Sequence, residues 1–273
     1  APSVQHRLKV IIDSKNLVLE NVYNQEPLSY DEIMEWCRSQ AEFFKDYICD
    51  VGTLLGAAAG QGKNILFEAQ LGALRDIDYG IYPFTSSSNT IASYAPIGAG
   101  IPGCALDNVV GVMKAYSTCV GEGPFVAETA MGEAWNEKLR ESGGEFGAAT
   151  GRPRRVGPFD AVASRYGIRC QKAQDIALTK LDVLGAFDKI PVITGYRLHG
   201  VLLDSFPTDS RLEEVEPVIE ELPGWECDIS GCRSWKDLPE NARKYVCTLE
   251  KLVDHPIYLV STGAERDAYL LRE

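Results

Sequence analysis

Short apolar runs alternate along this chain with helical patterns, and several of the runs adjoin segments rich in Gly, Ser or Thr. Strands that alternate with helices are typical of α/β folds. Loops at the ends of such strands are where open α/β sheets bind their ligands. We therefore predict an α/β fold, with a mostly parallel sheet flanked by helices, that binds a small ligand. Four segments have this composition and position: 67–72, 82–90, 179–182 and 261–263.

Residues 145–155 gather three arginines beside two glycines and a threonine, in a chain whose formal net charge is −12. Guanidinium groups bind carboxylates or phosphates through paired hydrogen bonds. Glycine lets the backbone approach a ligand closely, and a hydroxyl adds a directional hydrogen bond. The stretch predicts an anion-binding loop, and the alternative is a solvated basic turn that pairs with surface acids.

Composition excludes several classes of function. The acidic balance, with no long basic stripe, argues against a nucleic-acid partner. The eight cysteines show no C-x-x-C spacing and the three histidines stand far apart, so we interpret the cysteines as buried free thiols and expect no metal site. No apolar run approaches the roughly 18 residues of a membrane span, and no secretory signal opens the chain. Free thiols indicate a reducing compartment, and we expect a cytoplasmic protein without a membrane partner.

Apolar periodicity predicts the secondary structure in outline. Two short apolar runs, 10–12 and 17–19, flank a turn-like segment. A capping box precedes a long amphipathic helix expected over 30–58. The segment 68–103 is interpreted as an ordered loop, and 204–243 as a Pro- and acid-rich region with a solvated face. Further helices are expected over 106–112, 128–142, 159–166 and 239–253, and strands over 64–67, 113–120, 191–198, 257–260 and 268–271, with a strand and then a loop over 175–182.

The segment 179–182, Thr-Lys-Leu-Asp, follows one of these expected strands. An Asp at a strand end can accept hydrogen bonds from both N1–H and the N2 amine of guanine, a donor pair that adenine lacks. The lysine stem can lie over the face of the base. Alone, the four residues are as typical of an ordinary turn, and the Ser-Thr-Gly of 261–263 is an equally weak signal.

Together, the motifs resemble the adenylosuccinate synthetase family in order and spacing, from about Leu8 to the C-terminus. The motifs that carry the resemblance are 67–68, 74–78, 82–83, 87–90, 114–118, 120–125, 145–147, 150–152, 179–182, 223–225 and 261–263.

The resemblance implies a P-loop-NTPase-like synthetase fold with long ligand-binding loops. It also implies a GTP- and Mg²⁺-dependent carbon–nitrogen ligase that phosphorylates the 6-oxygen of IMP and displaces the phosphate with L-aspartate. A cytoplasmic homodimer is expected. We expect one domain over 1–273, with a helical and strand lead-in over 1–66, IMP and aspartate loops over 67–158, and a guanine-nucleotide part over 159–273.

The same resemblance assigns ligand contacts by motif. Aspartate contacts are expected from Thr150, Gly151, Arg152 and Arg154. IMP contacts are expected from Gln70, Ser86, Val120 and Arg152. GTP contacts are expected from Lys180, Asp182, Ser261 and Gly263.

The chain departs from the family pattern at several positions. The family commonly has E-G-A-Q-G where residues 68–72 have Glu-Ala-Gln-Leu-Gly, so Gln70 is displaced by one position. Ala149 replaces a common Thr, Pro153 replaces an Arg, and Ser86 stands where a Thr is usual. The family's Gly-rich loop with its catalytic Asp, and its catalytic His, have no counterpart in the 273 residues, and His199 and His255 are interpreted as structural or surface residues.

We therefore assign no catalytic residue and no metal ligand in this chain. We expect the chain alone to be inactive, because catalysis of phosphoryl transfer rests on positioning and charge neutralisation at the phosphates. Two alternatives stay open: a non-catalytic purine-nucleotide-binding or regulatory protein derived from the family, and a ligase for another purine nucleotide.

Overall fold

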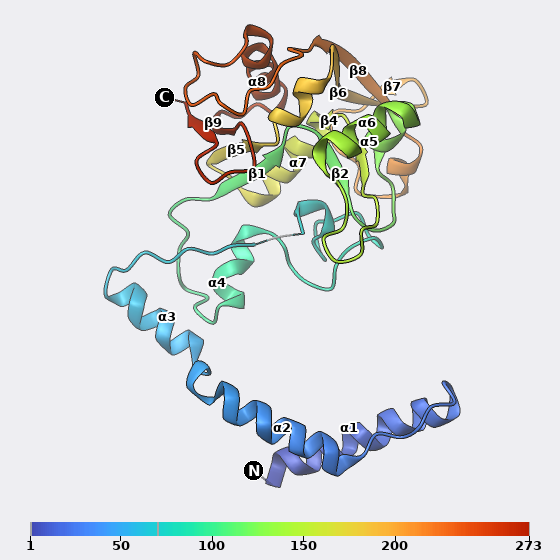
Figure 1. Ribbon diagram of the computed structural model, residues 1–273, viewed down its shortest axis with the longest axis vertical. Coiled ribbons are helices and arrows are strands. Elements are labelled where there is room, and N and C mark those ends of the chain that lie inside the picture. Colours follow the sequence, from blue (N-terminus) through green and yellow to red (C-terminus); the bar gives the residue numbers. More distant parts are fainter. Residues whose placement is uncertain (1, 70, 273) are drawn as a thin grey trace. The chain divides into compact units, whose positions relative to one another are not determined.

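The computed structural model describes residues 2–69 and 71–272, which group into two compact units, Ala1–Lys63 and Asn64–Glu273 (Figure 1). Gln70 lies outside the described residues. Within the described part of the chain, no helix is both long and apolar enough to cross a membrane. The expectation of one domain over 1–273 stays a prediction.

The first unit is built from helices α1 (Pro2–Asn21), α2 (Tyr30–Phe44) and α3 (Val51–Gly60), with a 3-10 turn at Lys45–Tyr47. The expectation of a turn between residues 12 and 17 was wrong, since this segment lies inside α1. No Gly or Pro interrupts residues 3–21, and Lys9 pairs with Asp13, one helical turn further on, at 3.4 Å.

Two further expectations in this part of the chain were wrong. The helix expected over 30–58 is divided, because Asp50 caps a new helix by accepting from the Thr53 amide at 3.0 Å. The strand expected over 64–67 does not form, and Leu66 there is 93% exposed. A strand needs a hydrogen-bonded neighbour, and the described strands supply none at this segment.

The larger unit contains a four-stranded sheet in the order β1-β5-β9-β10. Strands β1 (Val110–Lys114), β5 (Asp175–Thr179) and β9 (Ile257–Ser261) are parallel, and β10 (Tyr269–Leu271) is antiparallel to β9. The strands expected at 175, 257 and 268 are confirmed. The helix expected at 106–112 was wrong, because β1 begins there as the parallel neighbour of β5.

A second sheet joins β4 (Phe159–Asp160), β6 (Lys189–Leu198), β7 (Val201–Leu202) and β8 (Glu216–Pro223), with β8 paired to β6. Strands β2 (Ser117–Cys119) and β3 (Arg155–Gly157) form an antiparallel ribbon. The strand expected over 113–120 is therefore broken into β1 and β2. The one expected over 191–198 is confirmed within β6.

Helices α5 (Val126–Thr129), α6 (Glu133–Gly143), α7 (Ala161–Gln171) and α8 (Glu240–Val253) complete this unit, with α4 (Ala95–Gly98) in the loop-rich segment 68–103. The helix expected over 239–253 is confirmed. The helix expected from 159 begins two residues later, because Asp160 is its cap. The helix expected over 128–142 is divided into α5 and α6. The architecture is α/β, with mixed and mostly parallel sheets flanked by helices.

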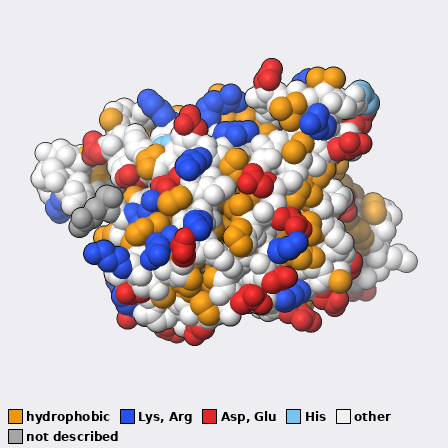
Figure 2. All heavy atoms as spheres, turned by 90° about the horizontal axis from the view of Figure 1, so that it is seen from above, with side chains coloured by type: hydrophobic (Ala, Val, Ile, Leu, Met, Phe, Trp, Pro, Cys, Tyr) orange, Lys and Arg blue, Asp and Glu red, His pale blue; other side chains and the backbone are white. Residues whose placement is uncertain are grey.

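The main core lies around the β1-β5-β9 sheet, where Leu178, Phe187 and Tyr245 are almost fully buried. On the face shown in Figure 2, acidic, basic and hydrophobic side chains are interspersed. The cysteines are all free, as expected, but the expectation that they are buried was wrong, since each is half-buried or exposed.

Candidate functional site

The carboxyl ends of three parallel strands meet at one edge of the main sheet. Lys114 at the end of β1 is in register with Thr179 at the end of β5, and Leu178 is in register with Val260 of β9. The loops that begin at Lys180 and Ser261 therefore leave neighbouring strands at the same level. The fold brings together the two loops from which guanine contacts are expected.

Asp182 begins the 3-10 helix Asp182–Ala186, directly after β5. Its Oδ1 atom is buried and has no hydrogen-bond partner among the described residues. A buried carboxylate oxygen without a donor is costly, which marks Asp182 as a side chain with no partner among the described residues. Lys180 has φ of 63° and donates from Nζ to the Gly143 carbonyl at 2.9 Å, which anchors its loop to the end of α6.

The loop after β9 is held by its own hydrogen bonds. Ser261 Oγ donates to the Gly263 carbonyl at 2.9 Å, and the buried Thr262 donates from Oγ1 to the Cys232 carbonyl at 3.2 Å. A Cβ atom at Gly263 would lie 3.1 Å from the Cβ of Ala268, so the loop packs tightly where glycine stands. The loop is therefore in place before any ligand arrives.

Glu145 links the sheet edge to the arginine loop. Its carboxylate is buried and accepts from Lys114 Nζ at 2.8 Å, Tyr116 OH at 2.6 Å and Arg154 Nη1 at 2.8 Å. Burial raises the pKa of Glu145, but the hydrogen bonds from Lys114 and Tyr116 outweigh it and hold the pKa below its ordinary value. Burial lowers the pKa of Lys114 against the opposing attraction of Glu145.

The arginine loop is a turn closed on itself. Phe146 and Pro153 form a bridge, the Gly147 amide donates to the Arg152 carbonyl at 2.8 Å, and Gly151 has φ of 64°. Thr150 and Arg152 are exposed, and no described residue accepts a hydrogen bond from the Arg152 guanidinium. Within this loop Arg152 is thus available to a ligand, whereas Arg154 already shares one nitrogen with Glu145.

The Arg155 side chain, unlike that of Arg152, is bound by other residues of the fold. Its guanidinium pairs with Glu128 at 2.6 Å and donates to the Gly121 and Gly123 carbonyls at 3.2 and 2.9 Å. Cys119 and Arg155 are opposite each other in the β2–β3 ribbon, so the arginine loop and Val120 lie at the same end of it.

Arg75 connects Val120 and Ser86, two of the residues expected to contact IMP. Its Nη2 donates to the Val120 carbonyl at 3.2 Å, and its own carbonyl accepts from the Ser86 amide at 2.8 Å. Sequence reasoning missed Arg75, because its partners are three backbone carbonyls and the Cys119 Sγ atom, 9 to 47 residues away. The isolated arginine within the otherwise apolar and acidic 74–78 motif was its only signal.

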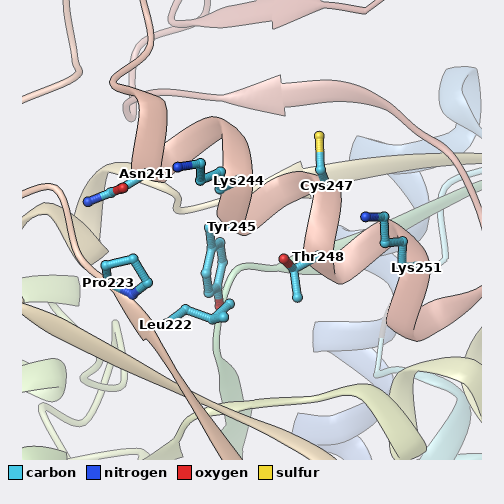
Figure 3. A pocket seen from close by; sticks show the side chains of 8 residues that line it. All are labelled: Leu222, Pro223, Asn241, Lys244, Tyr245, Cys247, Thr248 and Lys251. Carbon is cyan, nitrogen blue, oxygen red and sulfur yellow. The ribbon is translucent and has the colours of Figure 1, made fainter.

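No magnesium site is evident in the described residues, where no three His, Cys, Asp or Glu side chains gather closely enough to hold an ion. The donor set of the described residues does not fit Mg²⁺. His199 is exposed beside Glu214, and a ring nitrogen of His255 contacts the Ala173 carbonyl at 3.0 Å. A cavity of about 240 Å³ between β8 and α8 contains none of the candidate residues (Figure 3).

The family model for adenylosuccinate synthetase matches residues 1–270. The chain is 47% identical over 266 residues to the adenylosuccinate synthetase of Trichlorobacter lovleyi, covering 97% of this chain and 61% of that relative. It is 45% identical over 258 residues to the adenylosuccinate synthetase of Pelotomaculum thermopropionicum, covering 94% of this chain and 60% of that relative.

Among solved structures, fully ligated adenylosuccinate synthetase from Plasmodium falciparum superposes with a TM-score of 0.90 at 33% identity, covering 99% of this chain and 63% of that one. The chain thus spans about three fifths of the length of the relatives it matches. It belongs to the adenylosuccinate synthetase family, whose named members are ligases that form a carbon–nitrogen bond.

Proposed function

We propose that this chain supplies the purine-nucleotide and aspartate subsites of an adenylosuccinate synthetase. In this reaction the 6-oxygen of IMP attacks the γ-phosphorus of GTP as N1 of IMP gives up its proton, and GDP leaves. The aspartate amine then attacks C6 and loses a proton, and phosphate departs with the former 6-oxygen to give adenylosuccinate. Phosphorylation is required first, because the carbonyl-like oxygen is a poor leaving group by itself.

The observation that carries the proposal is the buried, unpartnered Oδ1 of Asp182 at the end of β5. A carboxylate there can accept from N1–H and N2–H of guanine, and an adenine base presents no such donor pair. Lys180 on one side and the ordered loop of Ser261 and Gly263 on the neighbouring strand support a base at this position.

Aspartate binding is assigned to the arginine loop. Arg152 offers a complete guanidinium fork, and Arg154 retains nitrogens beyond the one bound to Glu145. Thr150 and Gly151 add a hydroxyl and a turn backbone. Arg152 and Val120 are also assigned to the IMP ribose, Ser86 to the nucleotide phosphate and, on sequence alone, Gln70 to IMP. Neither alternative, a non-catalytic nucleotide-binding protein or a ligase for another purine nucleotide, is favoured by a feature of the described residues.

The phosphoryl-transfer residues that the family resemblance implies have no counterpart in this chain. The 273 residues contain no Gly-rich lysine loop, and their described part offers no magnesium donor set, so we expect no turnover from this chain alone. The homodimer and the cytoplasmic location implied by the family resemblance stay predictions.

A chimaera tests this proposal. The portion of the Trichlorobacter lovleyi synthetase that has no counterpart here is joined to this chain, and adenylosuccinate formation is followed with IMP, aspartate and either GTP or ATP. We expect turnover with GTP, little with ATP, and none from the 273 residues alone. A chimaera that binds the three substrates without forming adenylosuccinate would favour the non-catalytic alternative.

In the chimaera, Arg152→Lys should raise the aspartate KM about tenfold or more, because an ammonium group cannot form the two parallel hydrogen bonds of a guanidinium. Arg155→Lys should change the aspartate KM less, since that side chain is bound to Glu128 and two glycine carbonyls. Steady-state kinetics in aspartate compare the two variants. A larger effect from Arg155→Lys would reverse the assignment.

A further inference from the structure

Two arginines hold the loop 120–123 from both sides. Arg75 donates to the carbonyls of Val120 and Glu122, at 3.2 and 3.0 Å. Arg155 donates to the intervening carbonyls of Gly121 and Gly123, at 3.2 and 2.9 Å. Four successive carbonyls of one loop are therefore bound by two guanidinium groups in strict alternation.

The two glycines make this alternation possible. Gly121 has φ of 89° and Gly123 has φ of 105°, values that side chains with a Cβ atom rarely adopt. A Cβ atom at Gly123 would overlap the Phe84 side chain, so the loop lies directly against the segment 82–88. The backbone path of 120–123 is thus fixed by its glycines, by Phe84 and by the two arginines.

Arg75 alone spans both segments. Its Nη1 donates to the Phe84 carbonyl as well as to Glu122, and its backbone carbonyl accepts from the Ser86 amide at 2.8 Å. Arg155 reaches only the 120–123 side. Losing Arg75 would therefore remove hydrogen bonds from both segments, whereas losing Arg155 would remove them from one.

Charge also distinguishes the two arginines. Arg155 is neutralised by Glu128, at 2.6 Å. The described partners of Arg75 are three carbonyls and the Cys119 Sγ atom, at 2.8 Å, and no described carboxylate lies within ion-pair distance of it. No carboxylate among the described residues therefore pairs with the half-buried guanidinium of Arg75.

We propose that Arg75 is a positioning residue of the IMP subsite. It fixes the separation between Ser86, assigned to the nucleotide phosphate, and Val120, assigned to the ribose, so that one IMP molecule contacts both. This inference rests on the function proposed above and adds to it a residue that carries no ligand contact of its own.

The test uses Arg75→Lys and Arg75→Gln in the 273-residue chain, with Arg38→Gln as a control on an exposed helix. Calorimetry measures the affinities for IMP and GDP, and hydrogen exchange follows the amides of 82–88 and 120–123. We expect both Arg75 variants to weaken IMP about tenfold or more and to leave GDP within about twofold, because the guanine loops are separate. Both segments should exchange faster, and α8 should not.

Three results with the variants would overturn the inference. If Arg75→Lys binds IMP like the unmodified chain, charge and not positioning is what Arg75 supplies. If IMP and GDP affinities fall together, the substitution acts on the whole fold. If IMP binds normally to both variants while the two segments exchange faster, the hydrogen bonds of Arg75 hold the segments in place but do not contribute to IMP binding. A failure of the unmodified chain to bind IMP would instead refute the proposed IMP subsite, and the inference with it.

Discussion

Two acids of the site differ in how their carboxylates are satisfied. Glu145 is buried among three donors, whereas one oxygen of Asp182 is buried with no described donor. Native proteins rarely leave buried acceptors unpaired. The first arrangement holds the site together, and the second motivates our proposal that Asp182 binds a ligand.

Asp182→Asn should weaken GDP binding by about 1–3 kcal/mol, because one of the two acceptors becomes a donor that faces the N–H groups of guanine. The substitution barely changes side-chain volume, so the free energy of unfolding should stay nearly constant. Calorimetry with GDP measures the loss, and Asp188→Asn, at an exposed position six residues along, is the control. Unchanged GDP affinity in Asp182→Asn would show that Asp182 does not contact the guanine base.

Glu145→Gln should lower the free energy of unfolding by about 2–4 kcal/mol. Lys114 and Arg154 would lose their shared counter-charge, and the loss is moderated because both keep some solvent contact. Denaturant unfolding at pH 7 measures it, with exposed Glu141→Gln as the control.

Glu145 should also make the free energy of unfolding depend on pH. The pKa of Glu145 is lowered in the folded chain, so its contribution is complete above the unfolded pKa and is lost as the pH falls through the folded one. The stability gap between the unmodified chain and Glu145→Gln should therefore narrow on acidification. A gap that stays constant down to low pH would contradict the burial of an ionised Glu145.

Single residues also show what sequence could and could not predict. The Thr-Lys-Leu-Asp and Ser-Thr-Gly motifs could be placed after strands from local pattern alone, and β5 and β9 do precede them. The burial of Asp182 Oδ1 and the pairing of Arg154 with Glu145 could not, because both depend on contacts made only in the folded chain.

At the level of elements, the strands and the last helix of the C-terminal half were predictable, because buried parallel strands appear as short apolar runs bounded by turns. The apolar runs of α1 were misread, since an exposed helix with few buried residues has no clear apolar stripe. The short strands β3 and β4 were missed because their few residues pair only through tertiary contacts.

The start of α7 depends on one buried cap. Asp160 Oδ1 accepts from the Val162 and Ala163 amides, each at 3.0 Å, and Oδ2 accepts from the Tyr196 hydroxyl. Asp160→Ala should lower the free energy of unfolding by about 2–4 kcal/mol, because the cap is lost and a buried hydroxyl loses its acceptor. Asp50→Ala removes the exposed cap of α3 and should cost less. Equal losses in denaturant unfolding would mean that burial adds nothing to the Asp160 cap.

Asp160 should also show a pH dependence opposite to that of Glu145. Burial raises the pKa of Asp160 to about 6, although the capping hydrogen bonds oppose the shift. Since the folded chain then holds this proton more tightly than the unfolded chain, the Asp160 contribution to stability should fall as the pH rises from about 4 to about 6. Asp160→Asn should remove that fall, as comparison of its unfolding free energies with those of the unmodified chain would show.

For the molecule as a whole, the described candidate residues for guanine, aspartate and IMP all lie in the unit Asn64–Glu273. The resemblance predicted the family correctly over nearly the whole chain, and the match over residues 1–270 bears it out. The arrangement of ligand loops at one sheet edge followed from α/β principles, but the glycine loop held between Arg75 and Arg155 did not. Its hydrogen bonds join backbone and side-chain atoms far apart in sequence.

Titration of the unmodified 273-residue chain with GDP and with ADP, side by side in the calorimeter, tests the central claim most directly. GDP should bind, and ADP should bind at least about tenfold more weakly, because the Asp182 carboxylate can accept from the adjacent N1–H and N2–H of guanine, a donor pair that adenine lacks. Equal affinity for the two nucleotides, or no binding of GDP, would contradict it.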